Sequence, residues 1–362
     1  MKILFLEPFF GGSHKDFALG FAAHSSHEVD LVTLPDSFWK WRMQGASLYF
    51  INQVKNLAQY DLILTTDMMN LTDFIALAGR DLPPIVMYFH ENQLSYPLGF
   101  HGKKESHLGF ANMISAVAAD GLFFNSAYHL NAFLDEAGRR IDRMPDFTPD
   151  WIPERLMNKA RVLYPGCRFD AIPFALEKNS LDRPLIIWNH RWDYDKKPEV
   201  FFKVLAGLKK KGIGFYLALL GGQYEIIPEV FVTAREMFKE EILVYGYVSR
   251  EDYLSWLSKG SVVVSTAIQE NFGISVVEAV RHGCFPLLPN RLSYPEIMPE
   301  KFHEQVLFRS TSDLGRKLAN FLLDPDQFFP MRQSLSDYAT RFSWELLSKQ
   351  YDNVLEKFKN GS

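Results

Sequence analysis

The sequence contains no long hydrophobic run and only two cysteines. No stretch approaches the roughly 18 uninterrupted apolar residues of a membrane-spanning helix. Residues 1–12 do not resemble a signal peptide, because Glu7 and Pro8 interrupt the apolar run. Cys167 and Cys284 lie far apart in apolar surroundings, which predicts buried thiols and offers no metal-binding spacing. We therefore expect a soluble, cytoplasmic protein without a membrane partner.

An excess of basic charge, internal repeats and low-complexity tracts are also missing. The formal net charge of −4 argues against a generally cationic nucleic-acid-binding protein, although a local basic face is compatible with that sum. The loop at residues 7–15 contains Gly11 and Gly12 but lacks the G-x-G-x-x-G spacing of a dinucleotide-binding turn. These features disfavour an NAD-binding protein.

Two series of apolar, strand-like segments alternate with helical patterns, the first within residues 2–166 and the second within residues 185–308. Such alternation is typical of parallel sheets covered on both faces. The 362 residues exceed the roughly 150 expected of one domain. We predict an α/β fold of two doubly wound Rossmann-like domains that bind ligands at their strand ends, across a cleft. The predicted boundaries are 1–167 for the N-terminal domain, 168–183 for a linker, 184–342 for the C-terminal domain and 343–362 for a final helix.

The most informative segment is AIQENFGISVVEAVRHG, residues 267–283. It places Glu270 before a glycine turn and Glu278 on the amphipathic helix that Gly273 opens. The free backbone N–H groups and the dipole of the first helical turn suit a pyrophosphate. Glu270 can accept hydrogen bonds from sugar hydroxyls, and Glu278 can accept them from both hydroxyls of a ribose. Simpler explanations are a first-turn charge for Glu270 and a solvated helix face for Glu278.

Two cations, Arg191 and Lys196, follow the strand-like segment at residues 185–190. They can neutralise the two phosphates of a leaving nucleoside diphosphate, Arg191 as a planar fork and Lys196 as a point charge. Surface pairing with Asp193 and Asp195 is the alternative. The same aspartates form an Asp-x-Asp pair, but neighbouring lysines compete for them, so we predict no metal.

The first domain offers polar residues at two predicted strand ends. Gly11 and Gly12 let the backbone approach a ligand closely, and Ser13 is expected to cap the next helix. His90 ends another strand, a position typical of a binding site, although a hydrogen-bonded structural imidazole explains it equally well.

Together these motifs resemble the retaining glycosyltransferases of the GT-B fold, which include sucrose-phosphate and phosphatidylinositol mannosyltransferases. The segments EPFFGGSHK, TLPDSFWKWRMQGASLYF, MYFHENQLSYP and WNHRWDYDKKPE resemble, more specifically, the tRNA-queuosine α-mannosyltransferase family. The resemblance implies transfer of mannose from GDP-mannose to the cyclopentenediol of queuosine in the anticodon of aspartate tRNA. It also implies that the final helix, at residues 344–358, returns to the first domain.

The resemblance further implies roles for individual residues: Arg191 and Lys196 hold the diphosphate, Glu270 the hexose, Glu278 the ribose, and His90 the sugar from the first domain. The predicted catalytic residues are His90, Arg191, Lys196 and Glu270. The predicted donor-binding residues are Gly11, Gly12, Gly246, Tyr247, Val248, Asn271, Phe272, Gly273, Ile274, Ser275 and Glu278. The predicted acceptor-binding residues are Ser13, His14, Trp39, Trp41, Arg42, Glu91 and Asn92.

The acceptor side rests on aromatic and basic residues. Trp39, Trp41 and Arg42 interleave rings with a cation, which suits stacking on unpaired anticodon bases, whereas a packed tryptophan pair is the alternative. Further cations are placed to meet phosphates, although a helix dipole explains helix-end arginines equally well. These cations are Lys103, Lys104, Arg139, Arg140 and Arg143.

The implied chemistry retains the configuration of the sugar and needs no cofactor or metal. Cations and a helix N-terminus stabilise the departing diphosphate while the acceptor hydroxyl attacks from the same face, so no dedicated nucleophile is required. Two alternatives stay open: a transferase of this fold acting on a lipid, glycan or small molecule, and a nucleotide-sugar-binding module without catalysis. We infer no protein partner.

Overall fold

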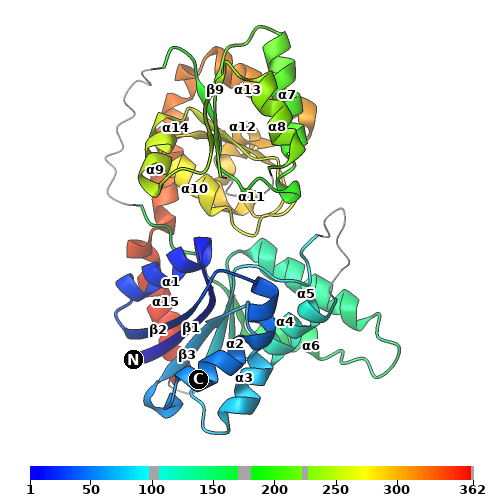
Figure 1. Ribbon diagram of the computed structural model, residues 1–362, viewed down its shortest axis with the longest axis vertical. Coiled ribbons are helices and arrows are strands. Elements are labelled where there is room, and N and C mark those ends of the chain that lie inside the picture. The colour runs from blue at the N-terminus through cyan, green and yellow to red at the C-terminus, as the bar shows by residue number, and fades with distance from the viewer. Residues whose placement is uncertain (98–105, 170–180, 222–226, 360–362) are drawn as a thin grey trace. The chain divides into compact units, whose positions relative to one another are not determined.

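The structure is a computed structural model that describes residues 1–97, 106–169, 181–221 and 227–359 (Figure 1). The chain folds into two compact units. Unit 1 comprises Met1–Arg168 and Phe342–Ser362, and unit 2 comprises Phe169–Arg341. Most of the predicted linker at 168–183 lies outside the described residues, as do Lys103 and Lys104.

Unit 1 is built on a six-stranded parallel sheet in the order β2-β1-β3-β4-β5-β6. Strand β1 pairs with both β2 and β3, so that Phe5 lies opposite Leu31 on one side and Leu64 on the other. Both faces of the central strands are buried, which explains their nearly continuous apolar sequences. The strands are β1 (Lys2–Phe10), β2 (Glu28–Pro35), β3 (Leu62–Thr66), β4 (Ile85–Phe89), β5 (Gly121–Phe124) and β6 (Ala160–Val162).

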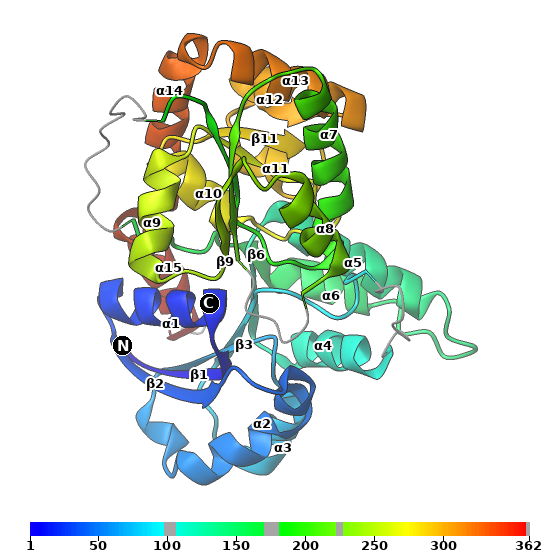
Figure 2. The ribbon, with the colours of Figure 1, turned by 45° about the horizontal axis from the view of Figure 1, so that its top comes forward.

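Helices cover both faces of this sheet, with α1 and α15 on one side and α2 and α3 on the other (Figure 2). The final helix packs Trp344 and Tyr351 against Phe17 and Phe21 of α1. The predicted return of the last helix to the first domain is therefore confirmed. The helices are α1 (Gly12–His24), α2 (Trp39–Gln53), α3 (Leu71–Ala78), α4 (Ser106–Ala118), α5 (Ala127–Ile141), α6 (Ile152–Lys159) and α15 (Trp344–Lys359).

Unit 2 contains a second six-stranded parallel sheet in the order β12-β11-β10-β7-β8-β9. Figure 1 shows α9, α10 and α14 on one side of it and α7, α8 and α13 on the other. The strands are β7 (Leu185–Trp188), β8 (Tyr216–Leu220), β9 (Ile242–Gly246), β10 (Val262–Val264), β11 (Phe285–Pro289) and β12 (Leu307–Phe308). The helices are α7 (Pro198–Lys210), α8 (Glu229–Met237), α9 (Arg250–Lys259), α10 (Ile274–Arg281), α11 (Tyr294–Ile297), α12 (His303–Val306), α13 (Thr311–Leu323) and α14 (Phe329–Ala339).

The predicted α/β class with two doubly wound domains is confirmed, and both cysteines are buried as expected. One local prediction is wrong, because Ser13 does not cap α1. The N-cap is Gly11, without a side-chain hydrogen bond, and Ser13 lies within the first turn. Gly11 has no room for a side chain, since a Cβ there would lie 2.0 Å from Oδ2 of Asp36. A close approach to Asp36 therefore sets this turn.

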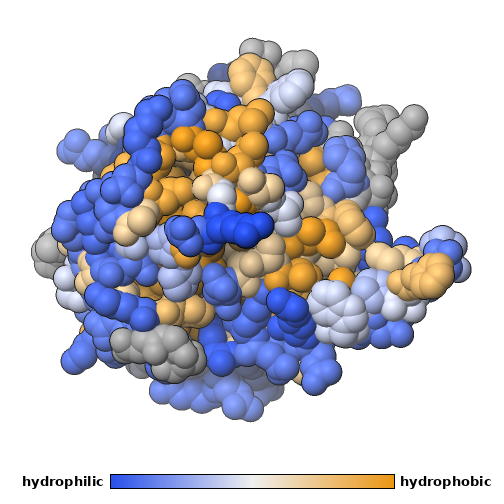
Figure 3. Space-filling model, turned by 90° about the horizontal axis from the view of Figure 1, so that it is seen from below, coloured by the Kyte–Doolittle hydropathy of each residue, from blue (hydrophilic) through white to orange (hydrophobic). Residues whose placement is uncertain are grey.

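Among the described residues, no helix is both long and apolar enough to cross a membrane. The space-filling view of Figure 3 shows hydrophobic residues gathered toward the middle of one face, with hydrophilic residues around them. Several large apolar side chains of unit 1 are exposed, among them Phe38, Trp41, Leu48 and Phe147. Exposed aromatic side chains of this kind are available for contacts with a partner.

Candidate functional site

In unit 2 a glycine turn connects β10 to α10, as the sequence predicted. Gly273 is the N-cap of α10 and has a φ of 98°, a left-handed conformation that favours glycine. The hydroxyl of Ser293 donates to the carbonyl oxygen of Phe272 at 2.9 Å and to that of Glu270 at 3.3 Å. Ser293 thus fixes the backbone of the loop at residues 270–272, directly before the first turn of α10.

Lys196 and Glu270 lie together beside this turn. The ammonium of Lys196 donates to the carbonyl oxygen of Gln269 at 2.7 Å and to Oε2 of Glu270 at 3.3 Å. It also lies 3.2 Å from Oδ2 of the fully buried Asp195. Burial raises the pKa of Glu270, but Lys196, with smaller contributions from His190 and Arg191, outweighs burial and the pKa is lowered. Glu270 is therefore an ionised hydrogen-bond acceptor.

Arg191 differs from Lys196 in being exposed. Its side chain is 57% exposed, and its guanidinium lies 3.8 Å from Oδ2 of Asp195. Lys196 is buried, so the alternative of a surface pair does not describe it. Asp193 caps the turn that follows it, since its carboxylate accepts from the backbone N–H of Tyr194. The two aspartates thus have separate structural partners.

Glu278 is not on a solvated helix face, which excludes that simpler explanation. Its side chain is only 10% exposed. Arg250 donates to Oε1 at 2.6 Å and the hydroxyl of Tyr253 donates to Oε2 at 3.0 Å. Both carboxylate oxygens therefore have donors from α9.

The other predicted donor residues of unit 2 lie at the same sheet edge, whereas Gly11 and Gly12 belong to unit 1. Gly246, with a φ of 108°, ends β9, and its carbonyl oxygen accepts from the backbone N–H of Gly221. Tyr247 is exposed and Val248 is half-buried. Asn271 and Phe272 are buried in the loop before α10, and Ile274 and Ser275 form the first turn of that helix.

Sequence reasoning missed His190, which lies between β7 and Arg191. It is buried, and its Nδ1 lies 3.4 Å from Oγ of Ser275. Burial, with a further contribution from Lys196, lowers the pKa of His190 to about 4. The imidazole is therefore neutral near pH 7. In the segment WNHRWDYDKKPE only the cations Arg191 and Lys196 were predicted as site residues.

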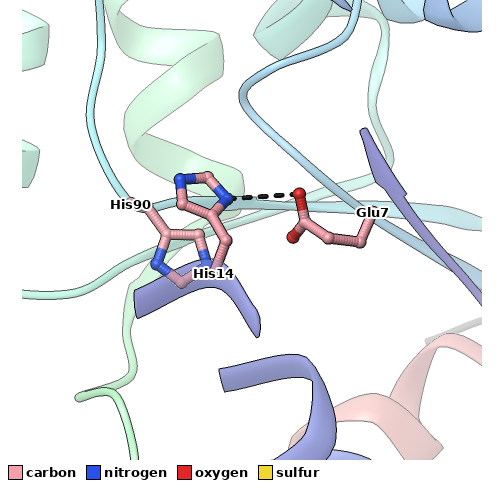
Figure 4. A group of neighbouring side chains, drawn as sticks. All are labelled: Glu7, His14 and His90. Carbon is pink, nitrogen blue, oxygen red and sulfur yellow. Dashed lines mark hydrogen bonds and ion pairs between the residues drawn. The ribbon is translucent and has the colours of Figure 1, made fainter. Parts of the chain in front are cut away.

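In unit 1 Glu7 of β1, His14 of α1 and His90, directly after β4, lie close together (Figure 4). Oε1 of Glu7 lies 3.2 Å from Nδ1 of His14, and the rings of His14 and His90 have centroids 4.1 Å apart. Burial lowers the pKa of His14, but the charge and hydrogen bond of Glu7 outweigh it and raise the pKa to about 9. The pair is an imidazolium and a carboxylate.

His90 has the opposite electrostatic character. Burial, and then the positive charge of His14, lower its pKa well below the usual value. Its backbone is fixed by Asp67, whose Oδ1 accepts from the His90 N–H at 2.8 Å, and by Asn125, which donates to its carbonyl oxygen. A cationic His14 thus lies against a neutral His90, with the two rings tilted by 38°.

Within the described residues, Glu7, His14 and His90 are the one group of His, Cys, Asp and Glu whose ligand atoms lie close enough to hold a metal ion. A histidine ligand must be deprotonated, whereas Glu7 keeps His14 protonated. A proton on His14 therefore competes with any metal ion at this group. Absence of a metal requirement nevertheless stays a prediction.

The predicted acceptor residues divide into two kinds. Asn92 is buried and bonded to Ser95 and His129, which favours a structural role, while Glu91 is half-buried and accepts from Gln93. The predicted acceptor residue Ser13 is exposed, and its neighbour Gly12, which was predicted to bind the donor, has a φ of 48° and open space at its Cβ position.

Trp39 and Trp41 do not form a packed pair. Trp39 packs against Met43 and Met68, whereas Trp41, two residues later on α2, is 69% exposed. Arg42 is half-buried, and its Nε donates to the carbonyl oxygen of Pro35. Trp41 is therefore the better candidate for stacking.

Comparison with known proteins gives matches across the whole chain. Residues 2–167 match the family described as tRNA-queuosine alpha-mannosyltransferase N-terminal, and residues 171–342 match glycosyl transferases group 1. A tRNA-queuosine alpha-mannosyltransferase of Drosophila melanogaster is 33% identical over 368 residues, which cover 98% of this chain and 96% of the relative.

Solved structures resemble the chain in fold. The sucrose-phosphate synthase from Thermosynechococcus elongatus superimposes with a TM-score of 0.75 at 14% identity and covers 100% of both chains. Anabaena HepE in complex with UDP superimposes with a TM-score of 0.71 at 15% identity, covering 99% of this chain and 100% of that one. These likenesses support the GT-B arrangement of two parallel sheets.

Proposed function

Because the chain belongs to the tRNA-queuosine alpha-mannosyltransferase family, we propose that it mannosylates queuosine in the anticodon of aspartate tRNA, with GDP-mannose as donor and retention of configuration. The observation that carries this proposal is the 33% identity to the Drosophila melanogaster enzyme, which extends over 98% of the chain and so spans both units. The chain is a glycosyltransferase, with a glycosyl transferases group 1 domain in residues 171–342.

The donor half of the reaction belongs to unit 2. The first turn of α10 supplies N–H groups and a positive dipole end for the diphosphate. Lys196 is buried and paired with two carboxylates, whereas Arg191 is 57% exposed, so Arg191 is the better placed of the two cations to reach the departing oxygens. Glu270, ionised and fixed by Lys196, accepts the hydroxyls of the hexose, and Glu278 accepts those of the ribose. Stabilisation of the leaving group is the main catalytic contribution.

The acceptor half belongs to unit 1. Trp41 offers an exposed ring for stacking on an unpaired base, a contact that contributes about 1–3 kcal/mol for each base. The imidazolium of His14, held by Glu7, adds a positive charge beside the neutral His90. A neutral imidazole can donate one hydrogen bond and accept another, which suits contact with sugar hydroxyls.

The decisive experiment incubates the purified protein with GDP-mannose and tRNA, followed by mass analysis of the nucleosides. We expect a queuosine nucleoside heavier by one hexose, formed from GDP-mannose and from aspartate tRNA but not from tRNA that lacks queuosine. Transfer to a lipid or glycan instead would show that the acceptor is not tRNA. Binding of GDP-mannose without hydrolysis or transfer would indicate a binding module.

The metal prediction is tested in the same assay. With EDTA present, we expect activity to stay largely intact, because Arg191, Lys196 and the helix N-terminus supply the positive charge. Reversible loss that Mg²⁺ restores would assign a metal to this site and return attention to Asp193 and Asp195.

A further inference from the structure

Glu278 stands at the end of a hydrogen-bonded chain that joins three elements of unit 2. Asn189, directly after β7, donates through Nδ2 to the hydroxyl oxygen of Tyr253 at 3.0 Å and to the carbonyl oxygen of Ser275 at 2.7 Å. Tyr253, on α9, donates in turn to Oε2 of Glu278 on α10 at 3.0 Å. The chain connects the central strand of the sheet to the carboxylate of the proposed ribose site.

The direction of each hydrogen bond in this chain is determined. Burial, and then the charge of Glu278, raise the pKa of Tyr253 well above its usual value, so the phenol keeps its proton. An ionised carboxylate can only accept, and Tyr253 must therefore donate to it. The phenol oxygen and the carbonyl oxygen of Ser275 both accept from the amide nitrogen of Asn189. Asn189 thus holds the phenol in its donating orientation.

These contacts fix the plane of the carboxylate. Tyr253 holds Oε2, while Arg250, three residues earlier on α9, holds Oε1 at 2.6 Å. A glutamate side chain has three rotatable bonds, and ordering it costs conformational entropy. Here that cost is met during folding, before any ligand arrives. A carboxylate held by both oxygens can receive two vicinal hydroxyls at once.

We propose that Asn189 and Tyr253 are positioning residues that make Glu278 select a donor with both ribose hydroxyls over its 2′-deoxy counterpart. The inference rests on the proposed function, since it requires a nucleotide sugar as donor. Both act through Glu278 and not through the sugar that is transferred. Their effect is confined to how well the carboxylate receives the second hydroxyl.

The test measures the binding of GDP and 2′-deoxy-GDP by calorimetry. We expect the wild-type protein to prefer GDP by about 10-fold or more, the range of one hydrogen bond to a charged group. Tyr253→Phe should lower that ratio to about 2- to 3-fold, because the phenol hydroxyl alone is removed. Asn189→Ala should act in the same direction while leaving the phenol in place, which provides a second variant if either one folds poorly.

Tyr216→Phe is the matched control. Tyr216 also donates its hydroxyl to a carboxylate of unit 2, Oδ1 of Asp182 at 3.0 Å. Tyr216 is the first residue of strand β8 and does not belong to α9. We expect it to leave the GDP to 2′-deoxy-GDP ratio unchanged. In the transfer assay, Tyr253→Phe should raise KM for GDP-mannose with little change in kcat, because the ribose contact is the same in ground and transition states.

The outcomes separate this inference from the proposed function. If the wild-type protein binds GDP and Tyr253→Phe retains the full ratio, the positioning role is refuted while the donor assignment stands. A wild-type protein that binds GDP and 2′-deoxy-GDP equally also refutes it. If the wild-type protein binds no GDP at all, the proposed donor itself is wrong.

Discussion

At the scale of single residues, Arg191 has a natural control in Arg183. Both arginines belong to unit 2, are about half exposed and lie 3.8 Å from an aspartate oxygen. We expect Arg191→Ala to lower kcat/KM, because it removes charge that stabilises the departing diphosphate. The loss should correspond to about 2–4 kcal/mol of transition-state stabilisation. Arg183→Ala should leave turnover unchanged. Equal rates for the wild-type protein and Arg191→Ala in steady-state assays would refute the assignment.

His14 predicts a dependence of stability on pH. Its pKa is raised to about 9 in the folded protein, so its contribution is fully present below the unfolded pKa of about 6.5 and is lost as pH rises through about 9. From pH 7 to 9.5 the loss is on the order of 2 kcal/mol at most.

The comparison that isolates this contribution uses His14→Gln. Urea unfolding curves of the wild-type protein and the variant, recorded at pH 7 and pH 9.5, should converge at the higher pH. Groups that titrate in both proteins cancel in the difference. A constant gap between the two proteins would mean that the ion pair with Glu7 adds nothing to stability.

The residues that sequence reasoning found and missed differ in one physical respect. Glu270, Gly273 and Glu278 lie in one continuous segment, where helix geometry alone relates them. Tyr253 and Asn189 reach Glu278 only through the packing of α9 and β7 against α10. No spacing in the sequence records that packing, and the ion pair of Glu7 with His14 escaped notice for the same reason.

At the scale of elements, the turn before α10 yields a matched pair of glycine substitutions. Gly273 and Gly212 have φ values of 98° and 72°, and a Cβ at Gly212 would meet nothing within 4 Å. Alanine in such a conformation costs roughly 1–2 kcal/mol. We expect both Gly273→Ala and Gly212→Ala to lower the melting temperature.

The two substitutions should differ in activity. A Cβ at Gly273 would lie in ordinary van der Waals contact with Ile297 and Tyr294, each at 3.4 Å, so its effect is the backbone strain that it places at the N-cap of α10. We therefore expect KM for GDP-mannose to rise in Gly273→Ala alone. Comparable kinetics in both variants would show that the turn has no part in donor binding.

Helix α2 provides the corresponding test for the acceptor. Trp41→Ala removes an exposed ring and should weaken tRNA binding by about 5- to 100-fold, the range for loss of one base stack, without loss of stability. Leu323→Ala, an equally exposed apolar residue of unit 2, is the control. Gel shifts with queuosine-containing tRNA measure the effect. Unaltered binding by Trp41→Ala would move the RNA contact away from α2.

Trp39→Ala distinguishes packing from stacking on the same helix. Because Trp39 packs against Met43 and Met68, its loss should lower the melting temperature of unit 1. The sequence analysis assigned both tryptophans to base stacking. Because α2 has about 3.6 residues per turn, residues 39 and 41 lie on different faces of the helix, and only Trp41 is exposed.

At the scale of the whole molecule, the net charge of −4 constrains how RNA is bound. Each phosphate contact on a single strand adds about 0.7 to the slope of log affinity against log salt. We expect a shallow slope of about 2, from a few local cations, with aromatic stacking supplying much of the affinity. Binding titrations at salt concentrations from about 50 to about 200 mM measure this slope. A slope of about 6 or more would indicate a broad basic face.

The two-sheet architecture was predictable because parallel strands that are buried on both faces leave continuous apolar runs, such as LIIW and FPLLP. The N-cap of α1 was not. At Gly11 the close approach of Asp36, a residue 25 positions later, overrides the local preference for a serine cap.

The place of α15 in unit 1 has a consequence for biosynthesis. Trp344 fills space that Gly20 and Gly166 leave open, since a Cβ at either would lie about 2 Å from its ring. The ribosome therefore completes unit 2 before it makes the helix that closes the apolar face of unit 1. Until residues 344–359 emerge, Phe17 and Phe21 lack their contacts with Trp344 and Tyr351, and the apolar surface left uncovered favours aggregation of the nascent chain.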